Sequence, residues 1–324
     1  MSQLEIFKVA LDEEIGQHSY GSEPAELYEP IRYLMDLQGK RLRPMLAVLS
    51  TYLFTDHWQQ VLKPAHAVEV FHNFTLMHDD IMDHAPLRRG MPTVHEKWNE
   101  NTAILSGDVM LVQAYELFLG LSPDILPQVL KRFNKTASEV CEGQQLDMNF
   151  EKMREVSIAD YINMIRLKTS VLLGFSMELG GWAGRAEQPV VEALYAAGEN
   201  MGLGFQIKDD LLDVYGDPGK FGKQIGGDIL SDKKTFLYLK ALELADTAQK
   251  EELTSLFSDS EPDSALKVKR VTGIYNALGI KEIAEEEVKK YFEKAIGTIR
   301  ELSAPDDRKR VLLSFVNQLW AREK

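Results

Sequence analysis

Residues 68–83 read VEVFHNFTLMHDDIMD, an apolar run that ends in three carboxylates. At about 100° per residue, Asp79, Asp80 and Asp83 share roughly a 100° sector of one helix. Like charges held so close oppose one another and raise the carboxyl pKa values unless a cation is bound. Oxygen ligands of this kind suit Mg²⁺, which typically takes one or two carboxylates together with phosphates and water. The stretch therefore predicts a helix whose carboxyl end binds a metal.

A second stretch repeats this spacing near the end of another predicted helix. Residues 202–216 read GLGFQIKDDLLDVYG and contain Asp209, Asp210 and Asp213. A single acidic triplet on a helix is usually a solvated face. Both triplets here lie within apolar sequence, which disfavours an outward-facing surface. We therefore predict that the two triplets face each other across one metal site.

Basic residues that suit phosphate follow the same logic. GKRLRP at 39–44 opens a predicted helix, where backbone N–H groups and the helix dipole favour anions. Arg88 and Arg89 follow the first acidic triplet, and the arginine fork binds phosphate oxygens in pairs. A cluster of this kind, taken alone, is more often a solvated turn. The joint presence of basic clusters and acidic triplets favours a diphosphate site.

Two further basic candidates lie later in the chain. One is Lys168, followed by Thr169, and the other is Lys223 in the glycine-rich segment FGKQIGGD at 221–228. That segment lacks the G-x-x-x-x-G-K-[ST] spacing of a Walker P-loop.

Apolar residues at helical spacing recur along the chain, and alternating strand patterns are scarce. We predict helices near 4–17, 25–38, 42–54, 60–83, 97–119, 124–148, 158–185, 188–215, 232–246, 263–278, 280–302 and 306–321. Loops are expected between Pro86 and Pro92 and between Gly216 and Gly227. No linker or repeat divides the chain, so we expect one all-α domain over 1–324, a bundle of long helices.

The overall composition excludes several classes of protein. A formal net charge of −13 and a pI of about 5.1 give no positive field for nucleic acid or an anionic membrane. No apolar run is long enough to span a bilayer, and no signal peptide is evident. The single cysteine, Cys141, cannot form an intrachain disulfide; we expect it to be buried and the protein to be cytoplasmic.

These motifs resemble, in order, those of the trans-isoprenyl diphosphate synthase (polyprenyl synthetase) family. The match runs from about Gly39 to Thr235 through GKRLRP, HNFTLMHDDIMDHAPLRRG, SGD, EGQQLD, LKTS, GFQIKDDLLD, FGKQIGGDI and DKKT. The resemblance implies an isoprenoid synthase-type bundle around a central cavity, working as a homodimer. It also implies Mg²⁺, three ions per active site, as cofactor.

The resemblance assigns roles to individual residues. The implied metal-binding residues are Asp79, Asp80, Asp83, Asp209, Asp210 and Asp213. Arg88, Lys168 and Lys223 would bind the allylic diphosphate, and Lys40, Arg43, His72 and Arg89 the diphosphate of isopentenyl diphosphate. Lys233 would be a further substrate-binding residue. Thr169 and Gln206 would lie beside the developing cation. The implied catalytic residues are Lys168, Thr169, Gln206, Asp79, Asp83 and Asp209.

The implied reaction is head-to-tail condensation of isopentenyl diphosphate with an allylic diphosphate, without a side-chain nucleophile. Phe74 occupies the fifth position before Asp79, where short-chain members carry an aromatic, and Thr75 beside it is small. Geranylgeranyl diphosphate is the expected product; farnesyl diphosphate or a longer polyprenyl product is the alternative. Phe74 could also be an ordinary core aromatic.

Three other classes of protein compete with this interpretation. A terpene cyclase shares the fold and first motif, but its second motif normally differs from Asp209-Asp210-x-x-Asp213. A non-catalytic partner subunit typically loses aspartates or basic contacts that are all retained here. A structural metal-binding bundle leaves the basic residues unexplained.

Overall fold

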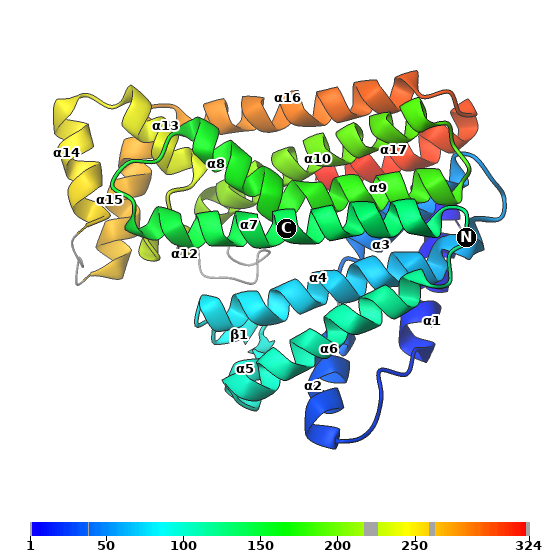
Figure 1. Cartoon of the computed structure of the whole chain (residues 1–324). Helices are drawn as coiled ribbons and strands as arrows, with labels where there is room; N and C mark the ends of the chain where they lie inside the picture. Colours follow the sequence, from blue (N-terminus) through cyan, green and yellow to red (C-terminus); the bar gives the residue numbers. More distant parts are fainter. Residues whose placement is uncertain (1, 38, 217–225, 259–262, 322–324) are drawn as a thin grey trace. The chain divides into compact units, whose positions relative to one another are not determined.

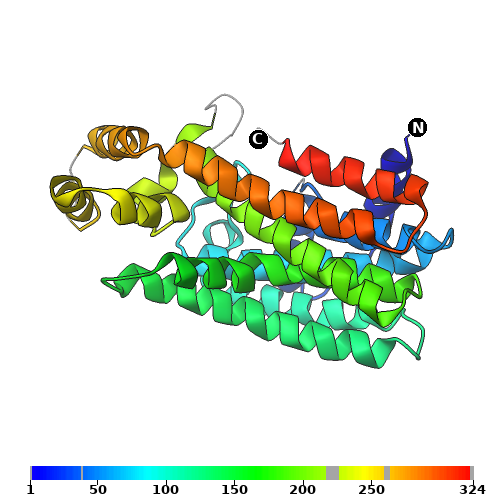
Figure 2. The same cartoon turned by 90° about the horizontal axis from the view of Figure 1, so that it is seen from above.

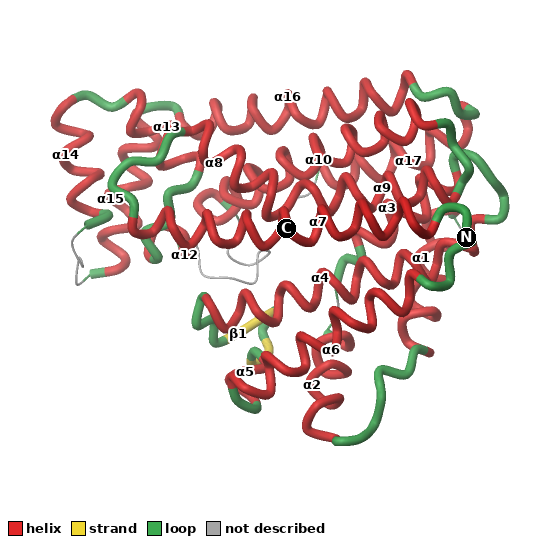
Figure 3. The backbone as a smooth tube through the Cα atoms, in the orientation of Figure 1, coloured by secondary structure: helices red, strands yellow, loops and turns green. Residues whose placement is uncertain are grey.

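The computed structural model describes residues 2–37, 39–216, 226–258 and 263–321. Regular structure in them is helical apart from one short strand pair (Figure 3), which confirms the all-α class. The longer helices are α1 (Gln3–Gln17), α2 (Ala25–Asp36), α3 (Leu42–Tyr52), α4 (Leu62–Met82), α6 (Glu100–Phe118), α7 (Leu126–Lys152), α8 (Ile158–Ile165), α9 (Val171–Ala183), α10 (Gln188–Tyr215), α13 (Phe236–Leu244), α14 (Thr247–Leu256), α15 (Ser264–Ala277), α16 (Ile280–Glu301) and α17 (Asp306–Trp320). The short elements are η1 (Trp58–Val61), β1 (Leu87–Arg88), β2 (Met91–Pro92), α5 (Val94–Lys97), η2 (Arg166–Ser170) and α12 (Gly227–Leu230).

Several predicted boundaries need correction. The single helix expected over 158–185 is interrupted by the π-helical turn η2. Helix α14 was not expected; its polar sequence begins with a capping box in which Asp246 and Gln249 bond each other's backbone N–H. The loop expected between Pro86 and Pro92 contains β1 and β2, which pair antiparallel. Cys141 is exposed, not buried as we expected, because it lies on the solvent side of α7.

The described residues form two compact units. Unit 1 comprises Met1–Thr136, Leu172–Ala196 and Thr298–Phe315, and unit 2 comprises Ala137–Val171, Ala197–Gly297 and Val316–Lys324. The boundary passes through α7, α10, α16 and α17 and after the first residue of α9. The single domain expected over 1–324 stays a prediction.

The core of unit 1 is rich in aromatic side chains. Helices α4 and α6 pack side by side (Figure 1). The ring centroid of Phe133 lies 5.0 Å from that of Phe71 and 4.8 Å from that of Phe118. Phe175 adds a third neighbour at 5.7 Å. Aromatic rings in such tilted and edge-on contacts bury a large apolar area. The part of α4 before its aspartates therefore packs, through Phe71, against this aromatic core.

Unit 2 has a core of its own. Phe292 of α16 is fully buried and stacks on Trp320 of α17, with ring centroids 5.9 Å apart. Helices α13, α14 and α15 lie together (Figure 2, yellow to orange) and enclose the stacked pair Tyr238 and Phe257. Among the described residues, no helix combines the length and apolar character that crossing a membrane requires.

Candidate active site

The first aspartate motif forms the carboxyl end of α4. Asp79 and Asp80 lie in the last turn, and Asp83 is the residue that follows the helix. Asp80 is only 3% exposed and accepts two hydrogen bonds from Arg88, at 2.8 and 2.7 Å. Burial raises the pKa of Asp80, while the Arg88 guanidinium opposes that rise. Asp83 is exposed and Asp79 half-buried, so these two carboxylates have access to solvent.

A tight hairpin brings Arg88 back to the helix end. Arg88 pairs with Met91 across β1 and β2, and the two residues between them, Arg89 and Gly90, both have positive φ. Two-residue hairpin turns favour positive φ, which glycine adopts readily. The two arginines have different partners: Arg88 binds Asp80, whereas Arg89 Nη1 donates to the carbonyl oxygen of Leu37 at 2.9 Å.

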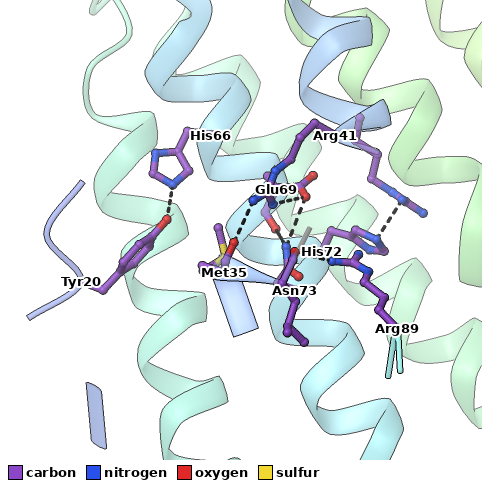
Figure 4. A network of polar contacts seen from close by, with 10 residues as sticks. Tyr20, Met35, Arg41, His66, Glu69, His72, Asn73 and Arg89 are labelled. Carbon is purple, nitrogen blue, oxygen red and sulfur yellow. Dashed lines mark hydrogen bonds and ion pairs between the residues drawn. The ribbon is translucent and has the colours of Figure 1, made fainter. Parts of the chain in front are cut away.

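A cluster of basic side chains, Arg43, His72 and Arg89, which we call the basic cluster, lies beside α3 and α4 in unit 1; Figure 4 labels His72 and Arg89. Arg43 Nη1 donates to His72 Nε2 at 3.0 Å. Loss of hydration, then the charges of Arg43 and Arg89, hold the pKa of His72 well below its ordinary value. His72 is therefore neutral and can accept this bond. Arg43 contacts His72, Arg89 lies against Gly39 at the start of the same turn, and Lys40 lies exposed on that turn before α3. Their binding of a diphosphate stays a prediction.

The residues predicted to limit chain length lie just above the aromatic core. The ring of Phe74 is 5.6 Å from that of Phe71 and 4.8 Å from that of His78. Thr75 is half-buried, and its hydroxyl donates to the carbonyl oxygen of His72 at 2.8 Å. Phe71 in turn contacts Phe133. Phe74 is half-buried and lies between His78 and Phe71 in a series of tilted and edge-on ring contacts that continues into the core of unit 1.

The second aspartate motif ends α10 in unit 2, and its middle residue is again held by protein. Asp210 is 5% exposed and accepts hydrogen bonds from the Tyr161 hydroxyl, from Gln206 Nε2 at 3.2 Å and from the Phe236 N–H at 3.4 Å. Asp213 accepts from the Asp228 N–H at 3.0 Å. Burial, then the charge of Asp228, raises the pKa of Asp210 well above its ordinary value. Asp209 is half-buried.

The π-helical turn η2 carries the predicted Lys168 and Thr169. Lys168 Nζ lies 2.7 Å from Asp147 Oδ2, and the Thr169 hydroxyl donates to Gln206 Oε1 at 3.2 Å. A π-turn widens the helix and is frequent at functional sites. Lys168, Thr169, Gln206 and Asp210 line the same cavity. The catalytic roles expected for Lys168, Thr169 and Gln206 stay a prediction.

These side chains line a cavity of about 110 Å³ in unit 2. The lining residues are Asp147, Phe150, Glu151, Tyr161, Met164, Ile165, Lys168, Thr169, Gln206, Asp210, Asp228, Asp232, Lys233, Lys234 and Thr235. The predicted Lys233 is among them. Asp147, Tyr161, Asp228 and Lys234 were given no role from sequence, although EGQQLD, GGDI and DKKT contain three of them. Lys223 lies outside the described residues.

The carboxylates fit a hydrated divalent cation better than a closed protein cage. In the part of the chain that the structure describes, no three His, Cys, Asp or Glu side chains are placed to hold an ion alone. Mg²⁺ typically takes one or two carboxylates and completes its shell with phosphate and water. An added cation would also relieve the repulsion between Asp210 and Asp228. We predicted that the two motifs bind the same set of ions. Such a site would involve residues of both units, and it stays a prediction.

Comparisons with known proteins agree with this inventory. The polyprenyl synthetase family model matches residues 24–275. The geranylgeranyl diphosphate synthase of Saccharolobus solfataricus is 38% identical over 302 residues, which cover 92% of this chain and 90% of that enzyme. The geranylfarnesyl diphosphate synthase of Natronomonas pharaonis is 34% identical over 275 residues, 79% of each chain. A crystal structure of a geranylgeranyl pyrophosphate synthase matches with a TM-score of 0.95, 42% identity and full coverage of both chains.

The helical fold and the family match make this protein an enzyme, a trans-prenyltransferase. The chain belongs to the polyprenyl synthetase family and is a short-chain trans-isoprenyl diphosphate synthase. Divalent-metal dependence is a general feature of that family.

Proposed function

We propose that the protein condenses isopentenyl diphosphate with an allylic diphosphate and releases diphosphate, with geranylgeranyl diphosphate as the main product. The observation that carries this proposal is the basic cluster beside α3 and α4. Arg43 Nη1 lies 3.0 Å from His72 Nε2, and the Arg89 guanidinium lies against Gly39, the residue before Lys40. A diphosphate is the anion whose charge and oxygen geometry would balance such a group. We assign the isopentenyl diphosphate to this cluster, with Lys40 at its edge.

The cavity in unit 2 supports ionisation of the allylic substrate. The C–O bond breaks, the electron pair leaves with the diphosphate, and an allylic cation forms at C1. Lys168 would bind the diphosphate oxygens, and the Thr169 and Gln206 dipoles would lie beside the cation. Bound Mg²⁺, which we put at three ions per site, would neutralise charge on the leaving diphosphate.

Carbon–carbon bond formation then needs no protein nucleophile. The double bond of isopentenyl diphosphate attacks C1 of the cation, and the proton at its C2 passes to the released diphosphate. The new allylic diphosphate is the primer for the next round. Phe74 would end the series by blocking the growing chain, and its contact with Phe71 supports that role. Farnesyl diphosphate and the longer geranylfarnesyl diphosphate are the alternative products.

We also propose that the enzyme is a homodimer in the cytoplasm. An exposed apolar face on α6 supports association: Ile104, Leu105 and Val112 are 43%, 58% and 59% exposed. The exposed thiol of Cys141 suits a reducing compartment. Light scattering should give twice the chain mass, and Leu105→Glu should give the monomer, whereas Leu244→Glu in unit 2 should not. A wild-type monomer would contradict the proposal.

The deciding experiment is incubation of the purified protein with Mg²⁺, isopentenyl diphosphate and one allylic primer at a time. Dimethylallyl, geranyl and farnesyl diphosphate are the primers, and mass spectrometry reads the product. We expect geranylgeranyl diphosphate from each. Condensation with none of them would remove the proposed activity and favour a non-catalytic subunit.

A further inference from the structure

Glu69 is a buried carboxylate on α4 to which the proposed reaction gives no role. Its side chain is 3% exposed, and Oε1 accepts a hydrogen bond from Arg41 Nη1 at 2.8 Å. Asn73 Nδ2 lies 3.4 Å from the same oxygen (Figure 4). Burying a carboxylate is costly, and it persists where a partner compensates its charge. The role of the buried Glu69 carboxylate therefore depends on the other contacts of its partner, Arg41.

Arg41 holds a strained turn. It precedes α3 with φ 46° and ψ 35°, in the left-handed region that residues other than glycine rarely adopt. Such a conformation persists when its surroundings impose it. The Arg41 side chain supplies that constraint, because Nη2 also donates to the carbonyl oxygen of Met35 at 2.8 Å. One guanidinium thus ties the end of α2, the turn and Glu69 of α4 together (Figure 4).

The same turn carries the basic cluster. Lys40 immediately precedes Arg41, and Arg43 follows two residues later with its contact to His72. Arg89 lies against the other side of the turn: a Cβ added at Gly39 would come within 3.0 Å of Arg89 Nη1. A shift of the turn would therefore affect both Arg43 and Arg89.

We propose that Glu69 is a positioning residue for the basic cluster of Arg43, His72 and Arg89, with Lys40 at its edge, and that it acts through Arg41. Glu69 itself touches no substrate. The inference rests on the proposed function, which assigns isopentenyl diphosphate to this cluster. It predicts that loss of the Glu69 charge weakens the use of one substrate and spares the other.

The test is Glu69→Gln, which keeps the shape of the side chain and removes its charge. Because a small misplacement of binding groups is costly, we expect KM for isopentenyl diphosphate to rise about tenfold or more, with KM for farnesyl diphosphate and kcat within about threefold. Arg41→Lys should give the same split, since lysine lacks the fork that reaches both Glu69 and Met35. If the Glu69→Gln variant does not fold, the Arg41→Lys variant provides the test instead.

Glu178→Gln is the matched control. Glu178 is a buried carboxylate of the same unit, and its ion-pair partner is Arg132 of α7, with Nε at 2.7 Å. It should lower the melting temperature and leave both KM values unchanged. Equal changes for the two substrates in Glu69→Gln, or a rise in KM for isopentenyl diphosphate in Glu178→Gln too, would reduce Glu69 to an ordinary structural residue and overturn the inference.

Failure of the proposed function would look different. Wild-type protein that neither condenses the substrates nor binds isopentenyl diphosphate in calorimetry would overturn both proposals. Active wild-type protein together with unchanged KM values in Glu69→Gln and Arg41→Lys would overturn the positioning role alone.

Discussion

Arg88 grips the buried Asp80 carboxylate with two nitrogens, Nε at 2.8 Å from Oδ2 and Nη2 at 2.7 Å from Oδ1. A fork-on-carboxylate pair of this geometry is stronger than a single N–H contact. The middle aspartate of the first motif is therefore held by the protein. Its neighbours Asp79 and Asp83 remain the more accessible carboxylates of the motif.

Arg88→Met should destabilise the protein. It leaves the Asp80 charge buried without its partner, and breaking such a pair from one side costs about 3 kcal/mol or more. The change is measured by urea unfolding at pH 7. Arg185→Met, which removes the exposed pair with Asp124, should have no measurable effect. Equal stability of Arg88→Met and wild type would show that the Asp80 carboxyl does not depend on Arg88.

Asp79→Ala and Asp209→Ala should each reduce kcat at saturating Mg²⁺. Removing a group that stabilises developing charge typically costs about 100- to 1,000-fold in rate. Steady-state kinetics over a Mg²⁺ titration measure the loss. Asp307→Ala, which removes an exposed carboxylate on α17, should retain full activity. A near-normal rate in either of the two variants would take that motif out of the metal site.

The helices were largely predictable because a helix with one buried face has apolar residues at a period of about 3.6 in its sequence. Helix α10 has the predicted bounds, 188–215, since Pro189 favours its first turn and Gly216 follows its end. Helix α14 escaped prediction because its sequence, TAQKEELTSL, has little apolar periodicity. The π-turn at Arg166–Ser170 lies inside a continuous apolar pattern, so nothing in that pattern marks it.

The site was predictable as a set of residue types and less so as a set of contacts. The acidic and basic motifs identified the groups that the structure places near His72 and near Asp210. The Tyr161 hydroxyl on Asp210 joins residues 49 positions apart, and Glu69 joins Arg41 across 28. Long-range pairs of this kind depend on how helices pack, which local spacing does not encode.

Phe74→Ala should lengthen the product. Removal of the ring opens space between Phe71 and His78 and gives the growing chain more room. Mass spectrometry of the reaction products measures the shift, with geranylfarnesyl or longer diphosphates expected. Phe54→Ala, a half-buried aromatic of the same unit, should leave the product unchanged. An unchanged distribution in Phe74→Ala would make Phe74 an ordinary core residue.

His72 should make the protein less stable as the pH falls. Its pKa is well below 6.5 in the folded state, so only the unfolded chain takes up a proton near that pH. The contribution of neutral His72 to stability is therefore full above pH 6.5 and decreases below it. His72→Gln cannot titrate, so the melting temperature of wild type should fall relative to that of the variant between about pH 7.5 and 5.5. A constant difference would mean that His72 also takes up a proton in the folded protein.

Gly143→Ala should impair catalysis more than stability alone explains. A Cβ at Gly143 of α7 would lie 2.2 Å from the Lys168 backbone N, a contact that backbone movement alone can relieve. The moving segment is the π-turn that sets Lys168 against Asp147 and Thr169 against Gln206. Because misplacing catalytic groups by about 1 Å can cost about 100-fold, we expect a loss in kcat of that order. Gly273→Ala on α15 has open space around its Cβ and should stabilise by about 0.5–1 kcal/mol at unchanged kcat. A Gly143→Ala enzyme with normal kcat would show that the turn tolerates displacement, and the catalytic roles of Lys168 and Thr169 would then need another explanation.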